Sequence, residues 1–161
     1  TDARTPSLVA GEPPTLDGDQ RVRGFELSAS GNITRNWLVF AGYTFLDSEI
    51  VASNNPAEVG NSLLNTPRNS FNIWSTYRIG RFFFGGGPRF VGERFGNNVN
   101  TRIVDSYLVV DGMMSFKINK NFDIRVNAQN IGDKYYIDRI GGGHILPGPG
   151  RVILVSTAFN F

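Results

Sequence analysis

The sequence contains no cysteine and a single histidine, His144, among its 161 residues. The lack of cysteine excludes a disulfide framework, a thiolate metal site and a cysteine nucleophile. A metal site made of protein side chains is not expected, because His144 has no second histidine or carboxylate at ligand spacing. No nucleophile, base and orienting group occur together in a recognisable arrangement. We therefore expect no enzyme activity and no cofactor bound by protein side chains.

Long apolar runs and an excess of one charge are missing as well. No stretch of about 18 apolar residues is present, so a transmembrane helix is not predicted, and the first residues do not form a signal peptide. The 16 Lys and Arg residues nearly balance 14 Asp and Glu residues and are scattered along the chain, which does not indicate a nucleic-acid partner. The glycine cluster in "FFFGGGPRF" lacks the Gly-Lys-Ser/Thr ending of a phosphate-binding loop.

The sequence does contain apolar side chains at every second position. The carboxy-terminal segment 151–161, "RVILVSTAFNF", is the first example. A period of two predicts a β-strand with one apolar face. Its length is what a tilted transmembrane strand needs, about 9 to 11 residues. The apolar face of this segment is formed by Ile153, Val155, Thr157, Phe159 and Phe161.

The segment 122–130 separates its two faces most cleanly, with Phe122, Ile124, Val126 and Ala128 opposite Asp123, Arg125, Asn127 and Gln129. Lipid-facing positions of a barrel must be apolar, whereas lumen-facing positions can carry charge. The same rhythm predicts strands at 21–30, 37–47, 69–79, 82–95, 106–118, 122–130 and 151–161.

The connections between these strands alternate in length. The short connections are 31–36, 80–81 and 119–121. Each is followed along the chain by a long connection, and these are 48–67, 96–105 and 131–150. Bacterial outer-membrane barrels have this asymmetry, with tight periplasmic turns and long external loops. A soluble sandwich, such as a carbohydrate-binding domain, would have shorter strands and no such alternation. The sequence predicts an all-β, antiparallel transmembrane β-barrel in the bacterial outer membrane, surrounded by lipid.

Aromatic side chains are expected at the two membrane boundaries. Aromatic residues collect there because their rings are amphipathic. The residues expected at the periplasmic boundary include Trp37, Phe122, Phe159 and Phe161.

Seven strands do not close a barrel, because single-chain bacterial barrels have an even number and at least about 8. An open edge in lipid would leave unpaired backbone groups, each costing several kcal/mol. We expect residues 1–20 to be an extracellular loop or the end of a strand, and residues 21–161 to be the last strands of a larger barrel. The alternative is a small pore or adhesin-like barrel of about eight strands that uses residues 1–11 as its first strand.

Five segments in a fixed order carry a family resemblance over residues 18–161. They are "GDQRVRGFELSASGNITRNWLVFAGYTFLDSEI", "LLNTPRNSFNIWSTYRI", "VDSYLVVDGMMSFKI", "IRVNAQNIGDKYY" and "GPGRVILVSTAFNF". Together they resemble the late barrel of TonB-dependent receptors. The resemblance implies a barrel of about 22 strands, filled by an amino-terminal plug domain that is not in this chain. It also implies import of ferric siderophores with energy from the TonB complex, which would act through the amino-terminal part.

The segment 141–151, "GGGHILPGPGR", most resembles the catecholate-siderophore receptors of that family. In such receptors iron(III) is carried by the siderophore. A ferric catecholate is anionic and aromatic, so cationic and aromatic side chains in the external loops are expected to bind it. For each of these side chains the alternative is a solvated loop position or an inter-loop contact. The candidates are Arg94, Arg102, Tyr135, Tyr136, Arg139 and His144.

The terminal phenylalanine, Phe161, resembles the signal that the barrel-assembly machinery reads in outer-membrane proteins. We predict that Phe161→Asp lowers the amount of assembled barrel in the outer membrane, because a charge disrupts the apolar register of the last strand. Heat-modifiable migration of the complete receptor measures the assembled fraction. An unchanged yield of folded barrel would contradict this role.

Overall fold

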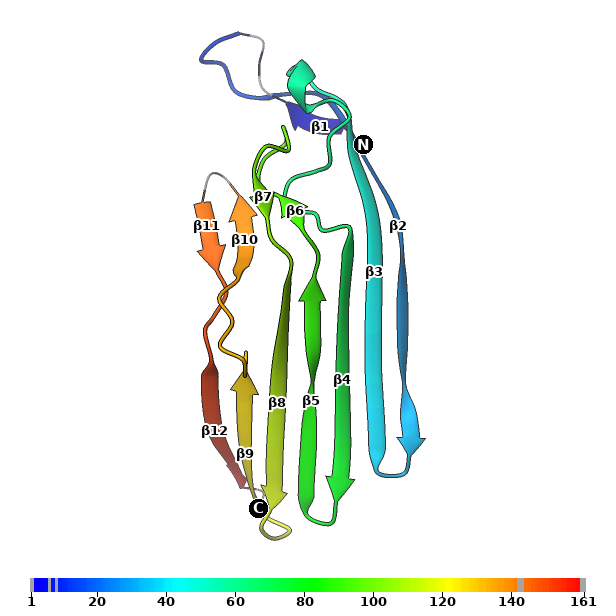
Figure 1. Cartoon of the computed structure of the whole chain (residues 1–161), viewed down its shortest axis with the longest axis vertical. Helices are drawn as coiled ribbons and strands as arrows, with labels where there is room; N and C mark the ends of the chain where they lie inside the picture. Colours follow the sequence, from blue (N-terminus) through cyan, green and yellow to red (C-terminus); the bar gives the residue numbers. More distant parts are fainter. Residues whose placement is uncertain (1, 6, 8, 142–143, 160–161) are drawn as a thin grey trace.

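The computed structural model describes residues 2–5, 7, 9–141 and 144–159. Eight strands form one sheet in the order β1-β2-β3-β4-β5-β8-β9-β12, and every neighbouring pair is antiparallel (Figure 1). The hairpins β6-β7 and β10-β11 are separate two-stranded sheets. The elements are β1 (Asp2–Thr5), β2 (Thr15–Thr34), β3 (Trp37–Ala52), η1 (Pro56–Glu58), β4 (Asn69–Ile79), β5 (Phe82–Val91), β6 (Arg94–Phe95), β7 (Ile103–Val104), β8 (Tyr107–Lys117), β9 (Phe122–Gln129), β10 (Ile137–Gly141), β11 (His144–Pro147) and β12 (Val152–Phe159).

The connections separate into two ends of the sheet. The short turns 35–36, 80–81 and 118–121 lie together at one end, which we call the short-turn end (Figure 1). The long connections 53–68 and 92–106 and the described residues of 130–151 lie at the other, the long-loop end. The predicted alternation of short and long connections is therefore confirmed. No helix among the described residues is long and apolar enough to cross a membrane.

Strands β2 and β3 extend well beyond the predicted segments 21–30 and 37–47. Pairing continues from Asn32 opposite Leu38 to Asp19 opposite Ala52. Twenty residues rise about 65 Å at roughly 3.3 Å per residue, which exceeds a hydrocarbon core of about 30 Å. The Asn, Pro, Ser and Glu content of 48–67 predicts a loop, but its first five residues, 48–52, continue β3. A strand that has left the membrane needs only backbone pairing.

The amino-terminal residues add a strand of four residues. β1 pairs with the beginning of β2, with Asp2 opposite Asp19 and Thr5 opposite Thr15. Within the described residues, β1 and β12 each have one neighbour, so they are the two edges of the sheet. This sheet of eight strands is open, which gives no support to a closed barrel of eight strands. Residues 15–20, expected to be part of an extracellular loop or the end of a strand, belong to β2.

The register aligns apolar side chains of neighbouring strands on one face. Phe71 lies opposite Tyr43 on one side and Phe90 on the other, and Val126 lies opposite both Met114 and Val155. These side chains are solvent-exposed in the isolated sheet; Phe25 is 50% and Val155 63% accessible. A soluble protein rarely exposes an apolar face of this extent, whereas a membrane strand must present one to lipid.

Aromatic residues cluster at both ends of this apolar face. Phe82 contacts Phe116 at the short-turn end, with ring centroids 4.5 Å apart, and Phe122 lies beside Phe159 at 6.4 Å. Trp37 directly follows the turn 35–36. Phe161 lies outside the described residues. The place of these aromatic residues at the membrane boundary stays a prediction.

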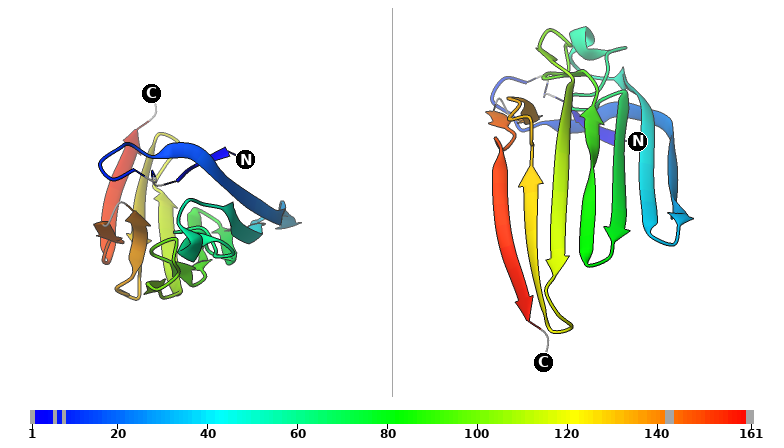
Figure 2. Two further views of the ribbon diagram at one scale, coloured as in Figure 1. Left: turned by 90° about the horizontal axis from the view of Figure 1, so that it is seen from above. Right: turned by 60° about the horizontal axis from the view of Figure 1, so that its bottom comes forward.

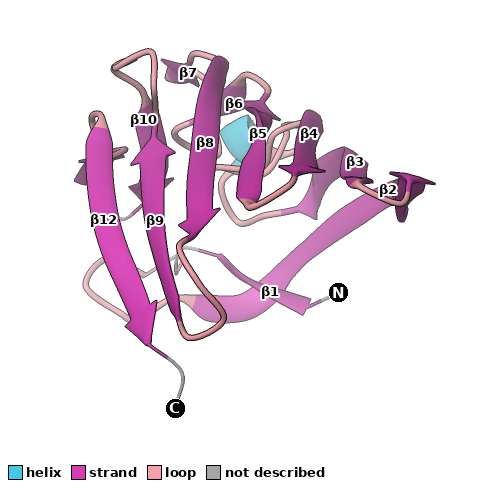
Figure 3. Ribbon diagram, turned by 90° about the horizontal axis from the view of Figure 1, so that it is seen from below, coloured by secondary structure: helices cyan, strands magenta, loops and turns pink. Residues whose placement is uncertain are grey.

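The opposite face is more polar and concave. Viewed along the strands, the sheet curves like part of a cylinder wall (Figures 2 and 3). Trp74 on β4 and Leu154 on β12 line one hollow of about 360 Å³ with Asp111 and Asn127. Three strands separate β4 from β12, so these side chains can share a hollow only on the concave face. This face corresponds to the lumen of the predicted barrel.

Trp74 interrupts the polar pattern of β4, and the glycines of β5 accommodate it. A Cβ at Gly85 would lie 3.1 Å from the indole Cζ2 of Trp74 and 3.0 Å from Cε of Met113. A Cβ at Gly87 would overlap the carbonyl oxygen of Ile73. The glycine cluster therefore allows β4 to approach β5 closely and leaves room for the indole of Trp74.

We predict that Gly87→Ala destabilises the barrel by about 1–3 kcal/mol, because the new methyl group forces β4 and β5 apart. Gly31→Ala is the matched control, since a Cβ at Gly31 has no atom within 4 Å. The free energy of unfolding of the complete receptor in denaturant and detergent measures the difference. Equal stabilities of the two variants would contradict the close approach seen at Gly87.

Candidate functional site

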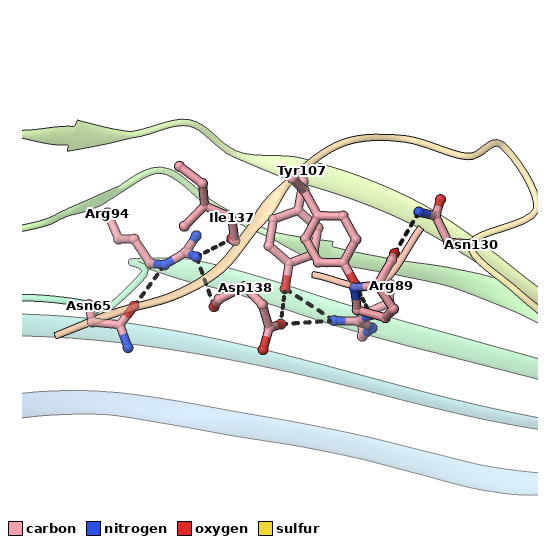
Figure 4. A network of polar contacts seen from close by, with 9 residues as sticks. Asn65, Arg89, Arg94, Tyr107, Asn130, Ile137 and Asp138 are labelled. Carbon is pink, nitrogen blue, oxygen red and sulfur yellow. Dashed lines mark hydrogen bonds and ion pairs between the residues drawn. The ribbon is translucent and has the colours of Figure 1, made fainter. Parts of the chain in front are cut away.

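The long-loop end contains a cluster of two arginines, two tyrosines and an aspartate that are distant in sequence. Arg89 comes from β5, Arg94 from β6, Tyr107 from β8 and Asp138 from β10 (Figure 4). Tyr136 directly precedes β10. The rings of Tyr107 and Tyr136 lie 4.3 Å apart and are almost completely buried. We call these five residues the Arg-Tyr cluster.

Arg89 lies at the centre of the Arg-Tyr cluster on the concave face. Its Nη1 donates to the hydroxyl of Tyr107 at 3.1 Å and its Nη2 to the hydroxyl of Tyr136 at 3.3 Å. The guanidinium also lies 5.6 and 5.8 Å from the centroids of the two rings, within the range of cation–π attraction. Its side chain is nevertheless 40% exposed. Arg89 is therefore oriented by the two phenols and still accessible to solvent.

Arg94 is 2% exposed and joins three external segments. Its Nε donates to Oδ1 of Asn65, 3.0 Å away, and its Nη2 donates to the carbonyl oxygens of Ile137 and Asp138 at 2.6 and 3.0 Å. These acceptors are neutral, and Nη1 has no hydrogen-bond partner among the described residues. One buried guanidinium thus fixes the connection 53–68, the β6-β7 hairpin and the β10-β11 hairpin relative to each other.

The "NIGDKYY" segment turns around a fully buried side chain, Asn130. The backbone N–H of Asn130 donates to Oδ1 of Asp111 at 2.7 Å. Its Nδ2 donates to the carbonyl oxygens of Lys134 and Pro149 at 2.8 and 3.0 Å, and its Oδ1 accepts from the N–H of Lys134 at 2.9 Å. Asn130 and Asp133 both have positive φ, 47° and 51°, which Asn and Asp tolerate better than most residues.

The same turn is held to the start of β12. Oδ1 of Asp133 accepts the backbone N–H of Arg151 at 2.8 Å, and Oδ2 lies 3.5 Å from the Arg151 guanidinium. The hydrogen bond from the Arg151 N–H first, and the positive charge of the guanidinium second, hold the pKa of the Asp133 carboxyl below its ordinary value. A Cβ at Gly148 would overlap the ring of Tyr136. The "DKYY" and "GPGR" segments therefore pack against each other, and this contact positions Tyr136.

Comparison with known proteins identifies the fold. A family model described as "TonB dependent receptor-like, beta-barrel" matches residues 3–131. The chain belongs to this family. Family membership confirms the predicted transmembrane β-barrel and places the chain in the outer membrane of a Gram-negative bacterium.

Several relatives of this TonB-dependent receptor barrel are siderophore receptors. The chain is 31% identical over 156 residues to the probable TonB-dependent siderophore receptor PiuA of Acinetobacter baumannii, covering 89% of this chain and 21% of PiuA. It is 32% identical over 152 residues to the catecholate siderophore receptor Fiu of Escherichia coli K12, covering 89% of this chain and 20% of Fiu. The chain thus spans about a fifth of the length of these curated relatives.

Solved receptor structures contain the same arrangement of strands. The crystal structure of PiuA superposes with a TM-score of 0.89 at 29% identity, covering 98% of this chain and 24% of that chain. The closed form of Fiu superposes with a TM-score of 0.81 at 28% identity, covering 99% and 23%. The open sheet therefore corresponds to a portion of a larger barrel wall.

In the receptor barrel, the six predicted ligand-binding residues fall into two groups. Arg94 and Tyr136 are buried in the Arg-Tyr cluster. The other four have exposed side chains in the long-loop connections: Arg102, Tyr135, Arg139 and His144. Tyr135 is 77% exposed. Contact with a ligand stays a prediction for all six residues. No group of three or more His, Cys, Asp or Glu side chains that could hold a metal ion occurs among the described residues.

Arg139 faces away from the Arg-Tyr cluster. On β10 it lies opposite Leu146, while the next residue, Ile140, is buried and reaches the position where a Cβ at Gly96 would stand. Consecutive strand residues point to opposite faces. Arg139 is therefore on the solvent face of the β10-β11 hairpin.

Sequence reasoning did not identify Arg89 or Asp138. Arg89 occurs in the glycine-rich part of β5, next to Pro88, where the residues have weak strand propensity and do not indicate a binding site. The signal that could have identified Arg89 is the alternation of side chains between the two faces of the strand. Arg89 shares the face of Gly85 and Gly87, opposite to Phe84 and Phe90, so it had to lie on the lumen side.

We predict that Asn130→Ala lowers the stability of the long-loop end by about 1–3 kcal/mol for each buried group left unpaired. Asn119→Ala is the matched control, because Asn119 lies exposed in a short turn, where its Oδ1 accepts the N–H of Asn121. Hydrogen exchange of the amides at 130–136 in the complete receptor checks the effect. Equal exchange protection in the Asn130 and Asn119 variants would contradict the structural role of Asn130.

Proposed function

We propose that the complete protein containing this chain is an outer-membrane receptor that imports ferric siderophores of the catecholate class with energy from TonB. The observation that supports this most strongly is the similarity to the catecholate siderophore receptor Fiu, which covers 89% of this chain. Similarity to the siderophore receptor PiuA supports the broader class. The protein acts as a receptor and transporter and not as an enzyme.

The long-loop end supplies the chemistry that a ferric catecholate requires. Such a complex is anionic and has aromatic rims, so it is bound by charge-assisted hydrogen bonds and by contact with aromatic rings. We propose that the exposed side chains of Arg102, Tyr135 and His144 contact it directly. Arg139, which faces away from the Arg-Tyr cluster, is proposed to attract the anion as it approaches. The buried Arg94 and Tyr136 contribute by holding the loops in position. Iron(III) needs no protein ligand, because the siderophore surrounds it.

We also propose the remaining partners. The concave face of β8 and β9 carries Asp111, Asp123 and Arg125, and these charges are proposed to contact an amino-terminal plug domain. TonB engages that amino-terminal part. The barrel-assembly machinery reads the terminal aromatic register, and outer-membrane lipid surrounds the apolar face.

Uptake by cells that carry the complete gene tests this proposal. We expect accumulation of iron-55 supplied as a ferric catecholate, and little accumulation when it is supplied as a ferric hydroxamate. Loss of TonB should abolish the uptake, and cells that lack the gene provide the background. Equal uptake of both complexes would contradict the catecholate class, and uptake without TonB would contradict the energy source.

A further inference from the structure

The contact between Arg89 and Asp138 is loose compared with the rest of the Arg-Tyr cluster. Nη1 of Arg89 lies 4.0 Å from Oδ1 of Asp138, and the hydroxyl of Tyr107 donates to the same oxygen at 3.3 Å. Optimal charge-assisted bonds between N–H donors and carboxylates are about 2.7–2.9 Å long. The side chains of Arg89 and Asp138 are 40% and 47% exposed. An ion pair this long and this exposed is easily replaced.

The two arginines of the Arg-Tyr cluster differ in what they can bind. Arg94 is enclosed, and its hydrogen bonds hold neutral acceptors in three loops. Arg89 has its orientation set by two phenol hydroxyls, so an incoming anion meets a guanidinium already held in place. Asp111 also attracts Arg89, but among the described residues the carboxylate that forms an ion pair with Arg89, at 4.0 Å, is that of Asp138.

We propose that Arg89 is the specificity-determining cation that binds the anionic ligand, and that Asp138 occupies Arg89 until the ligand displaces it. This inference rests on the proposed function for the identity of the ligand. Displacement removes the contact of Arg89 with Asp138 of the β10-β11 hairpin. The bonds of Arg94 to this hairpin persist, because Arg94 bonds the carbonyl oxygens of Ile137 and Asp138 and not the Asp138 carboxylate.

The two residues should have opposite effects on affinity. Arg89→Gln removes the positive charge, and we expect the complete receptor in detergent to bind ferric 2,3-dihydroxybenzoate at least about tenfold more weakly. Asp138→Asn removes the competitor and keeps the side-chain size, and we expect affinity to rise about threefold or more. Arg89→Lys keeps the charge and should stay closer to wild type than Arg89→Gln. A gain of affinity cannot result from a poorly folded hairpin.

Matched controls separate local contact from the general effect of charge. Arg81→Gln makes the same charge change at the short-turn end, where Arg81 bonds the carbonyl oxygen of Ile118. Asp105→Asn makes the same change as Asp138→Asn at an exposed position of the long-loop end. Both controls should bind within about twofold of wild type, since charges exposed to salt solution are screened.

The outcomes distinguish this inference from the proposed function. If the wild-type receptor binds no ferric catecholate, the proposed function and this inference are both overturned. If wild type binds but Arg89→Gln binds equally well, or Asp138→Asn binds more weakly, only the inference is overturned. If Asp105→Asn raises the affinity as much as Asp138→Asn, the effect is a general one of charge and the inference is likewise overturned.

Discussion

Backbone hydrogen bonding between neighbouring strands is the constraint on which this structure depends. In hydrocarbon no water replaces a missing partner, so each N–H and C=O must be bonded by the adjacent strand. That ladder fixes the register, and the register aligns Phe71 with Tyr43 and Phe90, and Val126 with Met114 and Val155. The apolar outer face and the concave polar face both follow from it. Where Pro88 cannot donate, Gly87 lets β4 approach without a side chain between them.

Outside the membrane, buried polar side chains hold the long connections in place. The long connections contain few buried apolar side chains, and polar groups with many bonds hold them instead. Arg94 joins three segments through neutral acceptors, and Asn130 closes the turn that carries Tyr136. Such buried polar groups specify one arrangement, because any other leaves a donor or acceptor unpaired. The result is a set of loops arranged around Arg89, a cation that stays partly open to solvent.

Much of the fold could be predicted, because strand periodicity and turn composition are local signals. The seven long strands, their order and the alternation of connection lengths follow from the sequence pattern, apart from the ends of β2, β3 and β5. The predicted strand 82–95 ends at Val91, and residues 94–95 belong to β6 in a separate sheet. The candidate site was less predictable. Residue type alone places Arg94 and Arg102 in one class, yet Arg94 is buried and Arg102 is exposed. Burial depends on which loops meet, and the loops carry no periodic signal.

The sequence by itself determined the class of the fold, because alternation every second residue requires a sheet with one apolar face, and that face needs lipid. It also determined the family, through the order of its motifs. Only the tertiary structure decided that Arg89, Tyr107, Tyr136 and Asp138 meet. These residues are up to 49 positions apart, from 89 to 138. Strand register and the Asn130 turn, acting together in three dimensions, bring them into contact.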